Sequence, residues 1–402
     1  MDGNCIIPEK NTKFAKSSSH SALMERFFNN VGPNNPEDCY TIDPLSRIDL
    51  DDILMMIRRK RYFVMHAPRQ TGKTSCLLAL RDYLNNEGEY IAVYANIEGG
   101  QAARNNVTNV IGATCDTLAE RFRTILRTKL PLEIREETRS LSPESMLSIY
   151  LQRLSEALPK PIVLLLDEID ALVGDGLVSV LRQLRSGYDS RPKSFPQSIV
   201  LCGVRDVRDY RIVLSNQDIV TGGSAFNIKT ESLRLGNFTR EEIHELYMQH
   251  TRETGQVFEE ECFDMVWEAT EGQPWLVNAL AREVTEKMKE NRDRSIRITA
   301  EMMDRAKESL IYRRDTHIDI LIDKLRKDRV RRVIQPILAN EEEVDESIIP
   351  SDDVQYVVDI GLVKQERGKP RRISCGIYRE IIPRELSRKS CATPWSAQSS
   401  TA

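Results

Sequence analysis

The feature that most constrains the fold is a short loop, residues 67–74, between an apolar run at 62–65 and a helical pattern that begins at Ser75. The loop reads Ala-Pro-Arg-Gln-Thr-Gly-Lys-Thr and fits the phosphate-binding pattern G-x-x-x-x-G-K-[ST], except that Ala67 replaces the usual first glycine. A strand, loop and helix in this order turn backbone N–H groups towards a phosphate at the positive end of the helix. We therefore expect a nucleoside triphosphate to bind here; the alternative is a chance Gly-Lys-Thr in a turn.

Several loop residues have specific expected roles. Gly72 lets the backbone approach the phosphate, Lys73 supplies charge to the β- and γ-phosphates, and Thr74 offers a hydroxyl to Mg²⁺. The whole loop should surround the nucleotide. The candidate nucleotide-binding residues are therefore Ala67, Pro68, Arg69, Gln70, Thr71, Gly72, Lys73, Thr74 and Ser75.

A second motif follows the continuous apolar run 161–166, which is typical of a strand buried on both faces of a parallel sheet. The run leads into the sequence Asp-Glu-Ile-Asp at 167–170. Acids at the carboxyl end of a central strand lie where ligands of open α/β sheets bind. We predict that Asp167 and Thr74 hold Mg²⁺ and that Glu168 acts on the water that attacks the γ-phosphate. An Asp-Glu pair that only starts a helix is the alternative, but the two motifs together predict an ATPase that uses ATP and Mg²⁺.

The pattern of elements predicts the fold class. Strands alternate with helices up to about residue 235, which indicates an α/β P-loop core with a parallel sheet in three layers. From Thr239 the pattern is purely helical, and residues 318–386 combine helices with two short strands around a basic turn, as in a winged helix-turn-helix. The predicted units are a flexible leader at 1–40, the ATPase core at 41–236, a helical lid at 237–312, a winged helix at 313–388 and a disordered tail at 389–402.

Composition limits the partners and the cellular compartment that we expect for this chain. The chain has 402 residues and a formal net charge of -4, so the chain as a whole has no strong attraction to nucleic acid or to a membrane surface. No apolar stretch approaches the roughly 20 residues that span a bilayer, and the N-terminus lacks the pattern of a signal peptide. The eight cysteines are scattered, without a C-x-x-C pair. We expect free thiols in a reducing cytoplasm and no membrane association.

The two motifs, the lid and the winged helix together resemble the AAA+ and STAND-like ATPases, in a bacterial and archaeal branch similar in layout to origin-recognition ATPases. The resemblance covers about residues 41–388 and implies three further roles. Arg205, after the predicted strand 198–202, matches a γ-phosphate sensor, with a surface salt bridge as the alternative. Asn96, at the end of a strand, matches a residue that restrains Glu168. Pro274, in Gly-Gln-Pro, matches a proline that lies against the nucleotide and couples the lid to it, with ordinary helix capping as the alternative.

The two motifs and the resemblance together make Glu168, Lys73 and Arg205 the candidate catalytic residues. They do not identify the binding partner. Basic residues cluster at the start of the predicted winged-helix unit and on its wing. There they could contact DNA or form a solvated charged face. These residues are Arg326, Lys327, Arg329, Arg331, Arg332, Arg367, Lys369, Arg371 and Arg372. Winged helices in STAND proteins often act instead as clamps that respond to ATP or ADP. The candidate functions are an ATPase that remodels or loads a partner on DNA, a slow switch acting through a protein partner, and a degenerate scaffold; a homo-oligomer is compatible with each.

Overall fold

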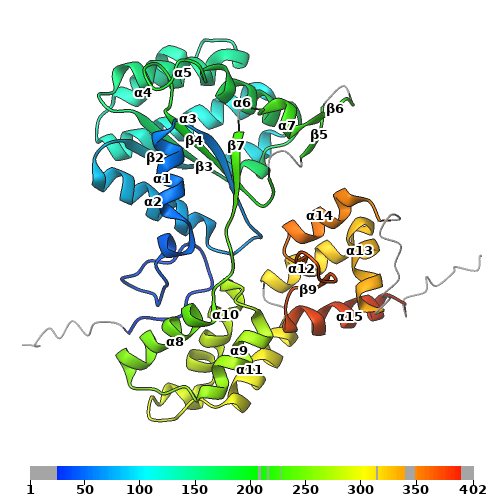
Figure 1. Cartoon of the computed structure of the whole chain (residues 1–402). Coiled ribbons are helices and arrows are strands. Elements are labelled where there is room, and N and C mark those ends of the chain that lie inside the picture. The colour runs from blue at the N-terminus through cyan, green and yellow to red at the C-terminus, as the bar shows by residue number, and fades with distance from the viewer. Residues whose placement is uncertain are drawn as a thin grey trace, which may run out of the picture.

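The structure is a computed structural model that describes residues 25–206, 210–214, 217–227, 229–313, 316–339 and 349–390. It shows a sheet-containing core, a helical part below it and a smaller helical part to one side (Figure 1). The first part of the predicted leader, residues 1–24, and residues 391–402 of the predicted tail lie outside the described residues.

The core is built on a five-stranded parallel sheet in the order β2-β3-β4-β1-β7. The strands are β1 (Tyr62–His66), β2 (Ile91–Asn96), β3 (Ile162–Asp167), β4 (Ser198–Gly203) and β7 (Lys229–Arg234). Four of these strands follow apolar runs of the sequence, whereas β7 is largely polar and lies within the stretch up to about residue 235 in which strands alternate with helices. Because the strands run parallel, the loop that follows β1 and the acids that follow β3 emerge at the same edge of the sheet, with only β4 between the two strands.

Helices cover both faces of this sheet, as predicted for a three-layer fold. Alternate residues of a strand point to opposite faces, and Val64 therefore packs in one buried cluster while Phe63 and Met65 pack in another. Phe63 and Met65 face α1 (Leu50–Arg58) and α2 (Lys73–Glu87). The helices that cover the other face are α3 (Val107–Leu126), α4 (Leu130–Thr138), α5 (Pro143–Ala157) and α6 (Gly174–Ser186).

Several short elements of the core were not predicted. A two-stranded hairpin, β5 (Arg211–Val213) and β6 (Ile219–Thr221), and a single-turn helix, α7 (Gly222–Ala225), lie between β4 and β7. They are too short to show a hydrophobic period. The described part of the core also contains the 3-10 helices η1 (Pro44–Arg47), η2 (Glu98–Ala103) and η3 (Ile169–Ala171).

The helices from Arg240 to Arg313 form a part of the structure that we call the lid. Its first helix begins at a capping box, in which the Thr239 hydroxyl accepts a hydrogen bond from the Glu242 N–H and the Glu242 carboxylate accepts one from the Thr239 N–H. The lid contains α8 (Arg240–Thr254), α9 (Glu260–Thr270), α10 (Pro274–Arg282), a π-helical turn η5 (Glu283–Lys287), η6 (Lys289–Arg292) and α11 (Ala300–Arg313).

The remaining elements form what we call the third unit. It contains α12 (Thr316–Leu325), α13 (Asp328–Leu338), α14 (Ser351–Asp359), the hairpin β8 (Val363–Lys364) and β9 (Arg372–Ile373), and α15 (Gly376–Ser390). Helices followed by a hairpin agree with the element order expected for residues 313–388. The assignment of this unit as a winged helix stays a prediction.

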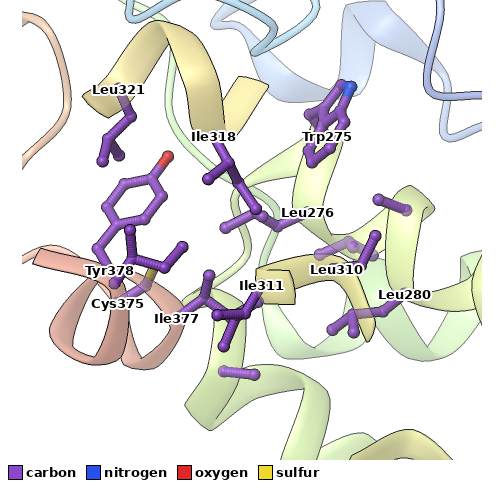
Figure 2. Packing of buried hydrophobic residues seen from close by; sticks show 14 of the residues in the cluster. Trp275, Leu276, Leu280, Leu310, Ile311, Ile318, Leu321, Cys375, Ile377 and Tyr378 are labelled. Carbon is purple, nitrogen blue, oxygen red and sulfur yellow. The ribbon is translucent and has the colours of Figure 1, made fainter. Parts of the chain in front are cut away.

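The lid and the third unit share one hydrophobic core (Figure 2). Trp275 and Leu310 of the lid belong to the same buried cluster as Ile318 on α12 and Tyr378 on α15. Separating the two parts would expose these side chains to water, which is unfavourable in proportion to the apolar area exposed. The lid and the third unit therefore pack as one helical body, which stands beside the core.

Residues 25–40 differ from the expectation of a flexible leader. Phe28 and Tyr40 are both fully buried against the lid, and Arg26 forms an ion pair with Glu253 of α8 at 2.8 Å. The segment is extended and irregular, so it has no hydrophobic period from which its order could be predicted. The leader prediction is therefore wrong for residues 25–40.

No helix among the described residues is long and apolar enough to cross a membrane. The cysteines in the described part of the chain are free and buried, which agrees with the expectation of free thiols. The same part of the chain holds no group of three or more His, Cys, Asp or Glu side chains arranged to bind a metal ion.

Candidate functional site

The loop between β1 and α2 is curled around the side chain of Lys73. The Lys73 ammonium donates hydrogen bonds to the carbonyl oxygens of Ala67 and Pro68, each at 3.0 Å. The Thr71 hydroxyl donates to the Pro68 carbonyl at 2.8 Å and tightens the same loop. Gly72 caps α2 with a φ of 90°, a left-handed conformation that favours glycine. The loop thus presents a positive charge and the N-terminus of a helix together, an arrangement suited to phosphate groups.

Hydrogen-bond donors converge on the carboxylate of Asp167 at the end of β3. The Thr74 hydroxyl donates to Oδ2 at 2.7 Å, and the Tyr94 hydroxyl donates to the same oxygen at 3.0 Å. The backbone N–H of Glu168 donates to Oδ1 at 2.9 Å. The two residues predicted to hold a metal, Thr74 and Asp167, are therefore in direct contact.

Tyr94 was not predicted as a site residue. Because side chains alternate along a strand, Tyr94 and Asn96 lie on the same face of β2. The register pairs Asn96 with Asp167. This alternation, combined with the pairing of β2 and β3, was the signal that could have identified Tyr94.

Glu168 has the environment of a carboxylate that can accept a proton. Burial and, to a lesser degree, the neighbouring charge of Asp170 raise its pKa above the usual value. Its backbone adopts a φ of 57°, in the left-handed region. A raised pKa makes the ionised carboxylate a stronger base, provided that it remains deprotonated at the working pH.

The loop opens onto a cavity of about 340 Å³ that lies between the core, the lid and the N-terminal segment. Its volume is within the range of small-molecule sites. Most of the predicted site residues line it: Arg69, Gln70, Gly72, Lys73, Thr74, Ser75, Glu168 and Pro274. Pro274 is the first residue of α10, so the start of this lid helix forms part of the wall.

The N-terminal segment forms another part of the wall and was not predicted to be part of a site. Asn29, Asn34 and Thr41 line the cavity. The segment is held on α10, because Trp275 Nε1 donates to the Asn30 carbonyl at 2.7 Å. The wall of the cavity therefore combines residues that are far apart in the sequence.

Arg47, at the end of η1, is a second residue that the sequence did not identify. Its guanidinium donates to the Thr71 carbonyl at 2.8 Å and to the Gly236 carbonyl at 2.5 Å. The group also lies over the ring of Phe238, 4.7 Å from its centroid, and burial lowers its pKa. Arg47 thus ties the phosphate-binding loop to the chain segment that leads from β7 into the lid.

The side chain of Asn96 bonds to the turn after β2, and not to Glu168 as the resemblance implied. The Asn96 Oδ1 accepts a hydrogen bond from the backbone N–H of Glu98 at 2.8 Å, which shapes the turn after β2. Among the described residues, no hydrogen bond joins Asn96 to Glu168. Asn96 uses its side-chain oxygen for the local bond to Glu98, since asparagine side chains readily bond to backbone N–H groups nearby.

Arg205 also differs from its expected position. Its Nε lies 3.1 Å from Oδ2 of Asp359 on α14, and its guanidinium lies over the Tyr356 ring at 5.4 Å. Arg205 lines a second cavity, of about 800 Å³, and not the one around Lys73. In this arrangement the arginine pairs with a carboxylate of the third unit that is itself buried.

The third unit and the lid contact the phosphate-binding loop directly. His317 on α12 hydrogen-bonds the side chain of Gln70, and Gln273 donates to the Gln70 carbonyl at 3.4 Å. Gly361, which follows α14, packs so closely on Pro68 that a Cβ there would lie 2.8 Å from the proline ring. The outer side of the loop is thus held by the helical body.

The basic residues of the third unit are largely paired with nearby acids. Arg329 and Arg332 both bind Asp353, at 3.1 and 2.8 Å, and Arg326 binds Asp323 at 3.0 Å. On the hairpin, Lys369 pairs with Glu366 at 2.5 Å. Much of the positive charge is therefore balanced locally, as expected for a solvated charged face.

Comparisons with known proteins agree with this architecture. A family model described as an AAA-like domain matches residues 51–383. The Walker-type ATPase PABY2304 of Pyrococcus abyssi is similar in structure, with a TM-score of 0.60 and 16% identity over 89% of this chain and 99% of that chain. The ORC2 protein of Aeropyrum pernix, solved as ADPNP-ADP complexes, is similar with a TM-score of 0.51 and 12% identity over 88% and 97% of the two chains. At these identities the likeness concerns the fold alone. No curated protein gives a significant match.

Proposed function

The chain belongs to the AAA-like domain family, and on this premise we propose that it binds ATP together with Mg²⁺ and hydrolyses the ATP. One observation carries the proposal. Lys73, enclosed in its loop, and the hydrogen-bonded pair Thr74 and Asp167 belong to one site beside a cavity of suitable size. Phosphates would replace the loop carbonyls as partners of the Lys73 ammonium.

The residues present fit a magnesium ion. Mg²⁺ prefers hard oxygen ligands and keeps several waters, so one or two protein oxygens together with phosphate oxygens are enough. Thr74 Oγ1 and the Asp167 carboxylate supply such oxygens and lie 2.7 Å apart. When bound, the ion would neutralise charge that develops on the phosphates.

We assign Glu168 as the residue that orients the attacking water and accepts its proton. It is the carboxylate directly after the Asp167 position, it lines the cavity, and its pKa is raised by burial. Asp167 is assigned to the magnesium ion, whose positive charge would make its carboxylate a weaker base.

We further propose that the nucleotide state alters the position of the helical body relative to the core. Loop residues Pro68 and Gln70 touch Gly361 and His317, so a change in the loop on phosphate binding would be felt by the third unit. Because the lid and the third unit share one core, they would move together.

The experiment that tests the proposal is steady-state ATP hydrolysis by the purified full-length chain with Mg²⁺. Lys73→Ala should abolish nucleotide binding, and Glu168→Gln should retain binding but lower turnover by about 10²-fold or more. Glu98→Gln is the matched control, since Glu98 also lines the cavity but is given no role. Wild-type-like turnover in Glu168→Gln would refute the assigned base.

A slow nucleotide switch is the second candidate function, and the contacts between the helical body and the phosphate-binding loop favour it. A motor or loader that acts on DNA would instead show turnover stimulated by duplex DNA. Adding duplex DNA to the same assay and measuring ADP retained through purification separates the two. Negligible turnover with retained ADP supports the switch, and DNA-stimulated turnover supports the loader.

A further inference from the structure

An unpaired polar atom is buried in a residue that lines the cavity. Asn278 lies on α10, one turn after Pro274, and the residue is 5% exposed. Its Nδ2 donates to the Pro274 carbonyl at 2.9 Å, which identifies the two ends of the amide because only the nitrogen can donate. Its Oδ1 is buried and has no hydrogen-bond partner in the described part of the chain.

Folded proteins pair nearly all their buried polar atoms, so an unpaired acceptor beside a cavity calls for a partner that arrives with a ligand. Arg47, which lines the same cavity, likewise has a buried Nε without a partner among the described residues. One atom is an acceptor and the other a donor. A ligand that carries both kinds of group would satisfy both residues.

Asn278 lies on the part of α10 that follows the contact with the phosphate-binding loop. The start of α10 touches this loop through Gln273 and Gln70. A helix rises about 1.5 Å per residue, so Asn278 lies about 7.5 Å farther along the helix axis than Gln273. It therefore lies in the cavity wall away from the end of α10 that contacts the loop.

We infer that Asn278 Oδ1 accepts a hydrogen bond from the nucleoside part of the bound nucleotide, either from a ribose hydroxyl or from the 6-amino group of adenine. The inference rests on the proposed function. Ionised phosphates accept hydrogen bonds but do not donate them, and the donors of ATP and ADP are the ribose hydroxyls and the 6-amino group of adenine. An acceptor in this place therefore pairs with one of those groups, and it disfavours a base with an oxygen at position 6 if its partner is the 6-amino group.

The test is a cycle of protein variants and ligand variants, measured by calorimetry with the full chain. Asn278→Leu keeps the size of the side chain and removes the acceptor. It should weaken ADP binding about three- to tenfold. It should leave unchanged the affinity for the one analogue that lacks the partner group. That analogue is purine riboside diphosphate if the donor is the 6-amino group, or 2′-deoxy- or 3′-deoxy-ADP if it is a hydroxyl.

Asn291→Leu is the matched control. Asn291 is also a buried lid asparagine with an unpaired Oδ1, but it does not line the cavity, so this variant should bind every ligand like the wild type. Equal loss of affinity for ADP and all analogues in Asn278→Leu, or no loss, would overturn the inference. Wild-type protein that binds neither ADP nor ATP would refute the proposed function, and the inference with it.

Discussion

His317 hydrogen-bonds Gln70, so a residue of the third unit reaches into the phosphate-binding loop. The same imidazole stacks on Trp275 of the lid, with ring centroids 4.8 Å apart, and its Nε2 lies 2.6 Å from the Tyr378 hydroxyl. His317 is therefore the point at which core, lid and third unit meet. A change of loop conformation on phosphate binding would have to be accommodated there.

Burial of His317 predicts a loss of stability in acid. Burial lowers its pKa from 6.5 to about 4, so below pH 6.5 the unfolded chain binds a proton that the folded protein does not. Stability from this group is present above pH 6.5 and is lost as the pH falls towards 4. We expect a loss of about 2 kcal/mol between pH 8 and pH 5.

Denaturant unfolding at each pH, for wild type and for His317→Gln, measures this contribution. The variant should lose less stability on acidification, because it has no imidazole to protonate. Burial also lowers the pKa of His250, but that residue is present in both proteins and its effect cancels. Identical pH dependence in the two proteins would contradict the prediction.

Asp170 should shift the pH dependence of turnover. Burial and then the Asp170 charge raise the pKa of Glu168, and a base must be ionised to accept a proton. Hydrolysis should therefore rise with pH through the raised pKa. Asp170→Asn should move this rise to lower pH, as measured by kcat between pH 4 and pH 8. A shift in the opposite direction would show that Asp170 acts by another route.

Arg47 should be required for the shape of the loop. Arg47→Leu removes its bonds to the Thr71 and Gly236 carbonyls. It should lower the free energy of unfolding by about 2 kcal/mol and weaken nucleotide binding. Arg47→Lys should not restore binding, because one ammonium cannot reproduce the planar fork of the guanidinium. Arg123→Leu, at an exposed ion pair with Glu120, is the control and should change neither quantity.

The Arg205–Asp359 ion pair should affect how long the nucleotide stays bound. The Asp359 side chain is 1% exposed, and the ion pair joins the segment after β4 to the third unit. We expect Arg205→Ala and Asp359→Ala each to accelerate ADP release and the double variant to add little, since both remove the same link. Stopped-flow release of ADP measures this. Arg329→Ala breaks an ion pair within the third unit and should leave release unchanged. Additive effects of Arg205→Ala and Asp359→Ala would argue against a shared link.

Sequence patterns alone predict the sheet, the phosphate-binding loop and the acids after β3. These features depend on residues close together in the chain: apolar runs that form buried strands, Gly72 and Lys73 in one turn, and Asp167 at a strand end. Local hydrogen bonds and hydrophobic period can be read directly from such neighbours.

Contacts between side chains that are distant in the sequence follow from tertiary packing and could not be predicted. Arg47 reaches Thr71, Tyr94 reaches Asp167, and the irregular segment that carries Asn30 closes the cavity against Trp275. Arg205 was expected at the phosphates and instead pairs with Asp359, far along the chain. Such contacts depend on how separately folded surfaces pack, and hydrophobic burial, which drives that packing, has no direction that a local sequence pattern could reveal.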